Sequence, residues 1–410
     1  MDLKRPAVPI LILSALVMAR AASAQQTDQT DPLDNALVRL GPVGINPSVS
    51  MHDVGRDENV FNDPVNPKSD VTFTLSPRAE VLFRPRIVHI DFLTATDYVY
   101  YRTYASQRGT DETATLRADF DLPRVQPFVS LQGINSRNRY NQEVDERARH
   151  HQTSYSAGAA FTVATRTSLT LALRRTDLSF DQGATFRGTD LAASFDSRLQ
   201  GADLSMAVAL TPFTTASVVF TEDRQRFTFA HDRDANTLRI SPTVTFSPQA
   251  IVKGSVSVGY SRFTPQSPLV PGWSGVTSTV NLTTALLGRY QIEGLLSRGI
   301  QYSYDLATPY YVTTGGTATF TMALFGPVDV KATGTRQRMA YRTEQTAETA
   351  AGTAGSDTFT SYGGGVGYRI RNRVRLGVNA DWSHRASQLA FDRTYRNRRV
   401  YASMTWGVQQ

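Results

Sequence analysis

The side chains best suited to chemistry in this chain are its histidines and a cluster of oxygen ligands near the amino terminus. His150 and His151 are adjacent and could bind a transition metal. The oxygen ligands, of the kind that calcium prefers, are Asp53, Asp57, Glu58, Asn62 and Asp63. Adjacent histidines on a strand point to opposite faces, and the acidic cluster lacks the fixed spacing of a known calcium loop. We therefore expect no metal and no other cofactor.

Motifs of the common hydrolases and nucleotide-binding enzymes are missing from the sequence. It has no Gly-x-Ser-x-Gly, no His-Glu-x-x-His and no P-loop. The glycine-rich run at 363–367 looks like a phosphate loop, but Tyr362, Val366 and Tyr368 alternate through it as in a strand. A Ser/His/Asp or Ser/His/Asn site could still assemble from distant strands. We expect that the protein is not an enzyme. The alternative is that it is a membrane enzyme that modifies lipid or lipopolysaccharide.

The amino-terminal residues predict export from the cytoplasm. Lys4 and Arg5 precede an apolar run from Ala7 to Met18, which ends in a small-residue stretch at 22–24. This is the pattern of a secretory signal peptide. We expect a signal peptide over 1–24, a periplasmic N-terminal segment over 25–42 and the folded domain over 43–410. The absence of cysteine excludes disulfides and thiolate metal sites.

The charge pattern argues against nucleic acid as a partner. The net charge is +7, and nearly all of the 43 basic residues are arginine. These arginines are spread along the chain among acidic residues, whereas a nucleic-acid-binding face concentrates them.

Apolar and polar residues alternate along most of the chain after residue 42. Near the carboxyl end, for example, Leu376, Val378 and Trp382 alternate with Asn379 and Asp381. A period of two residues indicates β-strands. Beyond the leader no stretch has 18 consecutive apolar residues, so no transmembrane helix is predicted. Alternating segments of about ten residues separated by turns are instead typical of a transmembrane β-barrel.

Short connections alternate with long polar ones along the chain. The short ones lie near 84–86, 123–124, 165–167, 211–213, 247–249, 288–289, 326–327 and 371–372, and the long ones include 54–69, 136–150, 181–197, 263–274, 342–357 and 386–395. We predict an all-β fold, a single transmembrane antiparallel β-barrel of about 18 strands with short periplasmic turns and long extracellular loops. Sixteen strands are an alternative. A propeller or soluble β-sandwich is disfavoured because no motif repeats.

Aromatic residues gather near both kinds of connection, as expected of two membrane-interface girdles. Beside the short turns lie Phe83, Phe128, Phe161, Phe213, Phe246, Tyr290, Phe325, Tyr368 and Trp406. Toward the long loops lie Tyr98, Tyr100, Tyr104, Phe227, Phe229, Tyr260, Tyr302, Tyr304, Tyr310, Tyr341 and Trp382.

If the apolar residues of each strand face lipid, the charged residues on the opposite face point into the lumen. These candidate pore-lining residues are Arg78, Glu80, Arg117, Asp119, Arg239, Asp329, Lys331, Arg369, Arg375 and Asp381. Charges on a barrel wall must be wet or paired with one another. Two hypotheses stand side by side, pore lining that acts on solutes and arginine–carboxylate pairs that brace a wide barrel.

The stretch from Gly55 to Asp63, with Asn59-Val60-Phe61 at its centre, resembles the N-terminal hallmark of the β-barrel porin 2 family, which is associated with exopolysaccharide operons. The likeness continues through 66–70, the Ser-Pro-Arg step at 76–78 and the Asp-Tyr-Val-Tyr run at 97–100. Beyond residue 100 the likeness is one of architecture. The resemblance implies an outer-membrane barrel with no catalytic residues to carry over.

The function expected from this resemblance is a porin-like channel for saccharide or other solutes, with a link to exopolysaccharide export. A structural or adhesive barrel without transport is a further alternative. The expected partners are outer-membrane lipid, lipopolysaccharide, the barrel assembly machinery and polysaccharide.

Overall fold

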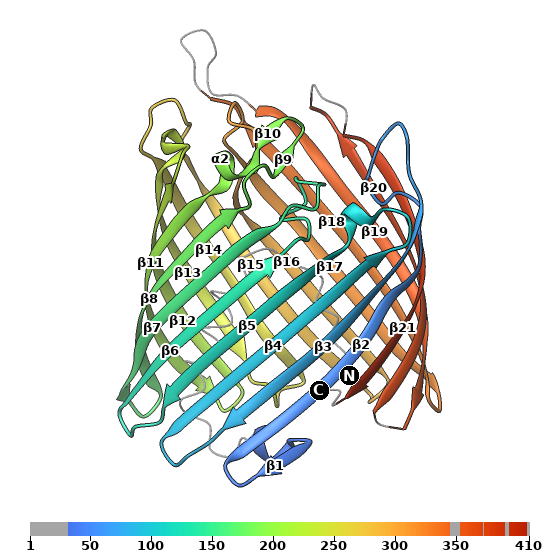
Figure 1. Cartoon of the computed structure of the whole chain (residues 1–410). Helices are drawn as coiled ribbons and strands as arrows, with labels where there is room; N and C mark the ends of the chain where they lie inside the picture. Colours follow the sequence, from blue (N-terminus) through green and yellow to red (C-terminus); the bar gives the residue numbers. More distant parts are fainter. Residues whose placement is uncertain (1–31, 345–352, 372, 390–392, 408–410) are drawn as a thin grey trace.

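A computed structural model describes residues 32–344, 353–371, 373–389 and 393–407 of the chain. The strands form one closed antiparallel barrel with long loops at one end and short turns at the other (Figure 1). The predicted signal peptide at 1–24 lies outside the described residues. No helix in the described part of the chain is long and apolar enough to cross a membrane.

Eighteen long strands make the wall, which confirms the larger of the two predicted counts. They are β2 (Val43–Asp57), β3 (Asp70–Phe83), β4 (Val88–Tyr101), β5 (Gly109–Phe120), β6 (Val125–Ser136), β7 (His150–Ala164), β8 (Thr167–Phe180), β11 (Ser197–Thr211), β12 (Thr214–Phe227), β13 (Ala235–Phe246), β14 (Val252–Pro265), β15 (Trp273–Leu286), β16 (Tyr290–Tyr302), β17 (Tyr310–Phe325), β18 (Val328–Arg342), β19 (Thr353–Ile370), β20 (Val374–Ser387) and β21 (Tyr395–Gly407).

Pairing of β2 with β21 closes the barrel, so each of the eighteen wall strands has a ladder with a neighbour on both sides. Val43 at the start of β2 pairs with Phe83 at the end of β3, and Trp406 near the end of β21 pairs with Val374. The first and last strands therefore begin and end at the short-turn end. A barrel with an even strand number requires this arrangement.

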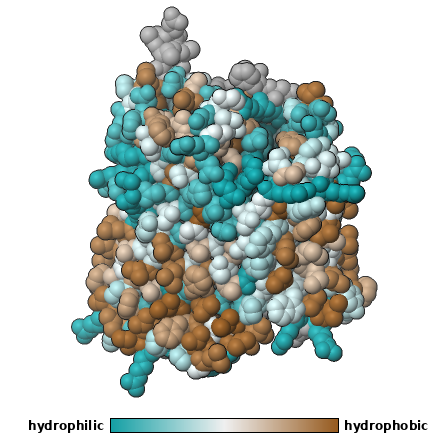
Figure 2. Space-filling view, viewed as in Figure 1, coloured by the Kyte–Doolittle hydropathy of each residue, from teal (hydrophilic) through white to brown (hydrophobic). Residues whose placement is uncertain are grey.

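Alternate residues of each strand face opposite sides of the wall. On β8, Leu171 and Leu173 are exposed, whereas Thr170 and Ala172, which alternate with them, are buried. The outer surface carries a hydrophobic zone toward the short turns and a hydrophilic zone toward the long loops (Figure 2). An apolar outer zone of this kind matches the hydrocarbon region of a bilayer.

Short elements decorate both ends of the barrel. At the short-turn end, η1 (Pro32–Asn35) and β1 (Val38–Leu40) fold back against the start of β2, where Leu33 lies over Gly44. At the long-loop end lie η2 (Ala105–Gln107), η3 (His231–Arg233), β9 (Thr185–Phe186), β10 (Thr189–Asp190) and α2 (Leu191–Phe195). Asp190 caps α2 by accepting hydrogen bonds from the Ala192 and Ala193 amides.

The predicted aromatic girdles need a correction. Several members are exposed as expected, and Phe73 with Tyr100 and Tyr362 with Trp382 stack on the outer face. The structure instead buries Phe128, Phe227, Tyr304, Tyr310 and Tyr341 inside the barrel or its loops, and half-buries Tyr302 there. Alternation alone predicted the wrong environment for these six, because loops and strand ends fold inward and give rings an interior apolar surface.

Candidate functional site

The inner wall carries charged residues in clusters that join neighbouring strands. On β5, the Arg117 guanidinium binds the Asp119 carboxylate at 2.5 Å and lies 4.6 Å from the centre of the Phe128 ring. Phe128 pairs with Asp119 across the β5–β6 ladder, so all three side chains share one face. The ring and the carboxylate together fix the arginine against the wall.

A second cluster spans four strands and contains only one residue predicted from the sequence, Arg239. The Asp223 carboxylate binds Arg239 at 3.7 Å and Arg174 at 2.5 Å. Arg174 also binds Asp203 at 2.9 Å, and Asp203 accepts a hydrogen bond from Thr221. Gly201 of β11 lies beside this cluster, and a side chain at this position would collide with Asp223 and Arg174. The alternation of Arg174 with Leu171 and Leu173 was the sequence signal that could have revealed this cluster.

Asp329, Arg369 and Arg375 form a third cluster, on β18, β19 and β20. Asp329 is buried, and its two oxygens bind Arg375 at 2.6 Å and Arg369 at 3.1 Å. These two arginines therefore brace the wall, and the cluster still carries one net positive charge. Lys331 lies on the same face of β18, beside Gly365 of the glycine-rich run that forms part of β19.

The remaining predicted residues lie apart from one another. Asp381 binds Arg399 at 3.1 Å and accepts a hydrogen bond from the Tyr401 hydroxyl at 2.8 Å. Glu80 accepts a hydrogen bond from Asn46, and Arg78, two residues away, is exposed. The ten predicted residues are thus distributed around the wall and do not converge on one centre.

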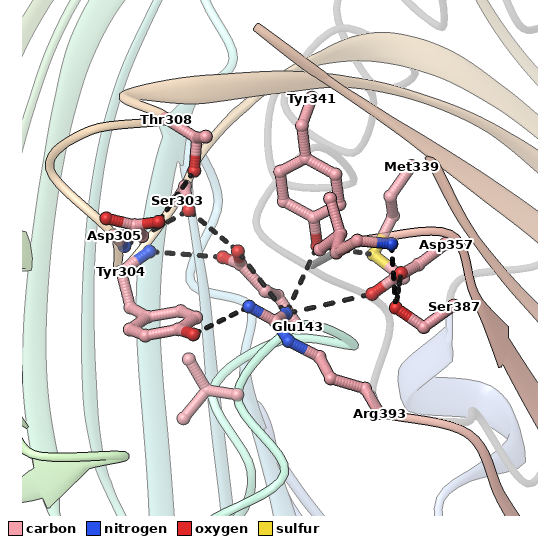
Figure 3. A network of polar contacts seen from close by, with 12 residues as sticks. Glu143, Ser303, Tyr304, Asp305, Thr308, Met339, Tyr341, Asp357, Ser387 and Arg393 are labelled. Atoms are coloured by element: carbon pink, nitrogen blue, oxygen red, sulfur yellow. Dashed lines mark hydrogen bonds and ion pairs between the residues drawn. The ribbon is translucent and has the colours of Figure 1, made fainter. Parts of the chain in front are cut away.

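Residues that do converge lie in the loops at the long-loop end. The segment 137–149, between β6 and β7, folds inward and reaches the opposite wall of the barrel. Its Glu143 is fully buried and accepts hydrogen bonds from the Ser303 hydroxyl at 2.7 Å and the Tyr304 amide at 3.1 Å (Figure 3). Ser303 and Tyr304 belong to the β16–β17 loop. We call 137–149, 181–196 and 303–309 together the plug.

Arginines anchor the plug to the wall and to neighbouring loops. Arg385 on β20 is fully buried and binds both Asp145 of the plug at 2.7 Å and Asp357 of β19 at 2.5 Å. Arg233 in η3 donates to the carbonyl oxygens of Ser194, Ser303 and Pro309. Arg393, between β20 and β21, donates to the Tyr304 hydroxyl at 2.6 Å and lies 3.8 Å from Glu143 (Figure 3).

An apolar core joins the plug segments beneath these contacts. It contains the buried residues Val144, Ala148, Phe180, Phe186, Leu191, Phe195 and Tyr304. Phe186 packs edge-on against Tyr304, and Tyr140 packs against Phe180 and Phe195. The plug is therefore folded structure with its own core rather than a set of solvated loops.

Burial dominates the protonation of Glu143. Removal from water raises the pKa of its carboxyl, and Arg393, the Ser303 hydroxyl and the Tyr304 amide partly oppose that rise. Burial likewise raises the pKa of the Tyr304 hydroxyl. A buried carboxyl whose pKa is raised is a group that can respond to pH.

Comparison with known families decides the class of this barrel. The family described as "Putative beta-barrel porin 2" matches residues 31–407, nearly the whole chain. The chain belongs to this family. It is a porin-like outer-membrane β-barrel, which agrees with the resemblance found at Gly55–Asp63. No curated protein sequence matches it.

Several solved barrels are similar to this porin family member at low sequence identity. The BenF-like porin from Pseudomonas fluorescens Pf-5 is 9% identical with a TM-score of 0.48, and the match covers 90% of this chain and 100% of that one. OccK2 (OpdF) from Pseudomonas aeruginosa, solved with glucuronate, is 9% identical with a TM-score of 0.47, covering 89% and 98%. The FrpB iron transporter from Neisseria meningitidis is 10% identical with a TM-score of 0.44, covering 93% and 83%.

Ser76, His52 and Asp53 on the wall of this porin contact one another in the sequence serine, histidine, aspartate that a hydrolytic triad has. The His52 ring lies 3.1 Å from the Ser76 hydroxyl through Nε2 and 2.7 Å from Asp53 Oδ2 through Nδ1. Asp53 adopts a left-handed backbone at a bulge in β2. Ser76, however, is 0% exposed, so a substrate cannot reach its hydroxyl in this conformation. We interpret the contacts as the hydrogen bonding of the bulge.

The histidine pair and the acidic cluster give no metal site in the structure. His150 is buried and His151 faces the other side of β7, where it lies 3.0 Å from Asp181. Within the described residues, no group of three or more histidine, aspartate or glutamate side chains is arranged to hold a metal ion. Asn62 of the acidic cluster instead donates a hydrogen bond to Asp145, and the neighbouring Asn59 donates to the carbonyl oxygens of Asp63 and Arg396.

Proposed function

We propose that this protein is a channel for saccharides or other small polar solutes, and that the plug is its gate. The observation that supports this most directly is the inward fold of 137–149, which crosses a wide barrel and is held by polar contacts around Glu143. A barrel of 16 to 18 strands is wide enough for an aqueous lumen unless loops fill it. Here the segments of the plug fold into its long-loop end.

The chemistry of the plug suits a gate better than a permanent seal. A purely structural plug is stabilised most cheaply by apolar packing, because a buried charge costs several kcal/mol unless it is fully paired. Glu143 and Arg393 are both buried here, yet they are separated by 3.8 Å. A buried carboxyl in such a cluster changes charge with pH, so the relative stability of the closed and open plug can change with its protonation.

The side chains of the inner wall favour polar solutes as the transported molecules. Arginine guanidiniums at Arg78, Arg174 and Arg369 face the lumen beside hydroxyl and carboxylate side chains. Such a wall can exchange hydrogen bonds with saccharide hydroxyls and carboxylates. The link to exopolysaccharide export rests on the family resemblance. We also propose contacts of the apolar outer zone with outer-membrane lipid and lipopolysaccharide, and insertion by the barrel assembly machinery.

Liposome swelling tests this function. Liposomes that contain the refolded protein are diluted into isotonic arabinose, glucose, sucrose or raffinose, and light scattering follows solute entry. A variant with 137–149 replaced by a short Gly-Ser linker should admit sugars faster than the wild type, with the rate falling as the sugar becomes larger. Rates equal to those of empty liposomes for both proteins would contradict the proposal and favour a structural barrel.

A further inference from the structure

The barrel wall has a seam between β15 and β16 in its long-loop half. Ladder pairs join the two strands from Leu286 and Tyr290 up to Ser278 and Arg298. Beyond that point, residues 273–277 pair with β14 and residues 299–302 pair with β17, but not with one another. Two strand edges therefore face each other without a ladder, which is costly in a membrane barrel and calls for a local substitute.

The two edges overlap at the seam. Leu296 and Tyr302 lie on the same face of β16, and Leu296 is exposed on the outside of the barrel. The Tyr302 ring nevertheless packs on Phe227 at 4.8 Å and on Phe263 at 6.2 Å, both of which lie on the inner face of the wall. The tip of β16 thus passes inside β15.

Arg298 bridges the seam where the ladder ends. Its Nε donates to the Val276 carbonyl oxygen at 3.0 Å, and its Nη1 donates to the Thr314 hydroxyl at 2.6 Å. One side chain thereby links β15 to β17 across β16. Val276 pairs with Tyr260, an exposed outward tyrosine of the kind that marks a membrane interface. The seam therefore begins near the interface and extends toward the long loops.

Cavities lie on both sides of this arginine. The inner one, of about 160 Å³, is lined by Asp223 and Arg239 and by hydroxyl side chains that include Ser257 and Ser261. The outer one, of about 400 Å³, is lined by Arg298, Arg338, Arg342, Val312, Thr314 and Ala340. Arg298 lines both cavities, so it is the partition between the lumen side and the outer side of the wall.

We propose that the seam is a lateral portal for an anionic, hydroxyl-rich solute such as an acidic saccharide, and that Arg298 is its latch. The proposal rests on the channel function proposed above and names a route and a solute class for it. Guanidiniums in the outer groove bind carboxylates, and the hydroxyls behind the seam exchange hydrogen bonds with sugar hydroxyls. The plug then gates the axial mouth, and the lateral path lets an acidic saccharide pass beside the plug without unfolding the plug core.

Cross-linking the seam tests the route. Because the chain has no native cysteine, only the introduced thiols react with the cross-linker. Thr277→Cys and Gly299→Cys place one thiol on each side of the seam, and both positions line the inner cavity. They are joined by a short bis-maleimide in the refolded full chain. The matched control is Thr245→Cys with Ser255→Cys, a directly facing pair in the β13–β14 ladder. The probe is trigalacturonate, with its entry into liposomes measured beside potassium chloride conductance.

Cross-linking the seam should lower trigalacturonate entry about tenfold while salt conductance persists, and the control cross-link should leave both unchanged. Unchanged entry after complete seam cross-linking, or salt conductance with no trigalacturonate entry in the uncross-linked protein, would overturn the portal and leave the channel standing. Absence of both salt conductance and trigalacturonate entry would overturn the channel and the portal together.

Single substitutions test the latch and the groove without chemical modification. Arg298→Ala should raise trigalacturonate entry several-fold, because the bridge to Val276 is lost. Arg262→Ala is the matched control, an exposed arginine on β14 that lines neither cavity. Arg338→Ala should raise the trigalacturonate concentration that half-blocks salt conductance about tenfold, equivalent to about 1.4 kcal/mol. Equal effects of Arg262→Ala and Arg298→Ala would contradict the latch.

Discussion

Glu143 accepts a hydrogen bond from the Ser303 hydroxyl at 2.7 Å, and this contact joins residues 160 positions apart in the sequence. It brings the β6–β7 loop against the β16–β17 loop inside the mouth of the barrel. Through Arg385, Arg393 and Arg233, the same cluster reaches β19, β20 and the β12–β13 loop. Within the described residues, these loops of the long-loop end are therefore connected to one another rather than independent.

Acidification should favour the closed plug. Burial raises the pKa of Glu143 above its ordinary value of 4.5, so the closed plug binds more protons than an opened plug whose Glu143 is in water. The closed state is stabilised as pH falls through the raised pKa, and this advantage is lost as pH rises through it. Channel open probability, recorded between pH 4.5 and pH 8, should rise with pH in the wild type.

Glu143→Gln is the control for this pH response, since the amide keeps the size of the side chain and does not titrate. Its open probability should vary much less over the same range. A wild-type response that Glu143→Gln fully retains would assign the pH dependence to another group.

The Asp329 cluster should contribute to both stability and selectivity. Arg369→Gln with Arg375→Gln leaves Asp329 buried without its partners, which should cost about 3–5 kcal/mol. Adding Asp329→Asn should recover most of that loss, as measured by thermal unfolding in detergent. If instead the double variant is as stable as the wild type, the two arginines do not brace the wall.

Ion selectivity separates wall bracing from pore lining in the same variants. The triple variant removes one net positive charge, so its reversal potential under a potassium chloride gradient should move toward cation preference. The candidate lining residues carry six basic and four acidic charges, and the wild type should show weak anion preference. No shift in a channel that still conducts would place the selectivity elsewhere.

Assembly should depend on the face that carries a new charge. Leu376 is exposed on the outer face of β20, and an arginine on the lipid face costs up to about 2–4 kcal/mol, the value at the bilayer midplane. Asn379 lies on the opposite face of the same strand, beside Ser403. Leu376→Arg should lose the heat-modifiable band on a detergent gel, and Asn379→Arg should keep it. If the barrel tolerates both substitutions equally, the assignment of the lipid-facing and lumen-facing sides of β20 is wrong.

The Ser76–His52–Asp53 contacts allow a direct test for hydrolase chemistry. Because Ser76 is buried, a fluorophosphonate probe should not label the folded protein. Labelling that disappears in Ser76→Ala, in a protein that remains folded by heat modifiability, would contradict this interpretation and favour the membrane enzyme.

The fold was predictable from the sequence because strand alternation and turn spacing are local properties. Leu376 and Asp381 could be placed on opposite faces from their positions alone, and the eighteen-strand count followed from the connections. Glu143 could not be found in this way. It lies in a segment with Arg139, Asp145 and Arg147, whose composition is that of a solvated loop, and its partners are distant in sequence.

The same limit explains Tyr302 and Tyr310. Their spacing placed them in an interface girdle, but the overlap at the seam turns them onto Phe263 of the inner wall. A one-dimensional pattern cannot report that a strand end passes inside its neighbour.

Single-channel recording tests the central claim, that the plug gates a solute channel, most directly. Wild type and the variant with 137–149 replaced by a Gly-Ser linker are compared in planar bilayers in the same salt. The wild type should show small or rare conductance steps, and the variant should show larger, long-lived steps because the segment that crosses the lumen is then missing. The absence of steps from both proteins, once each is shown by heat modifiability to be folded, would contradict the claim.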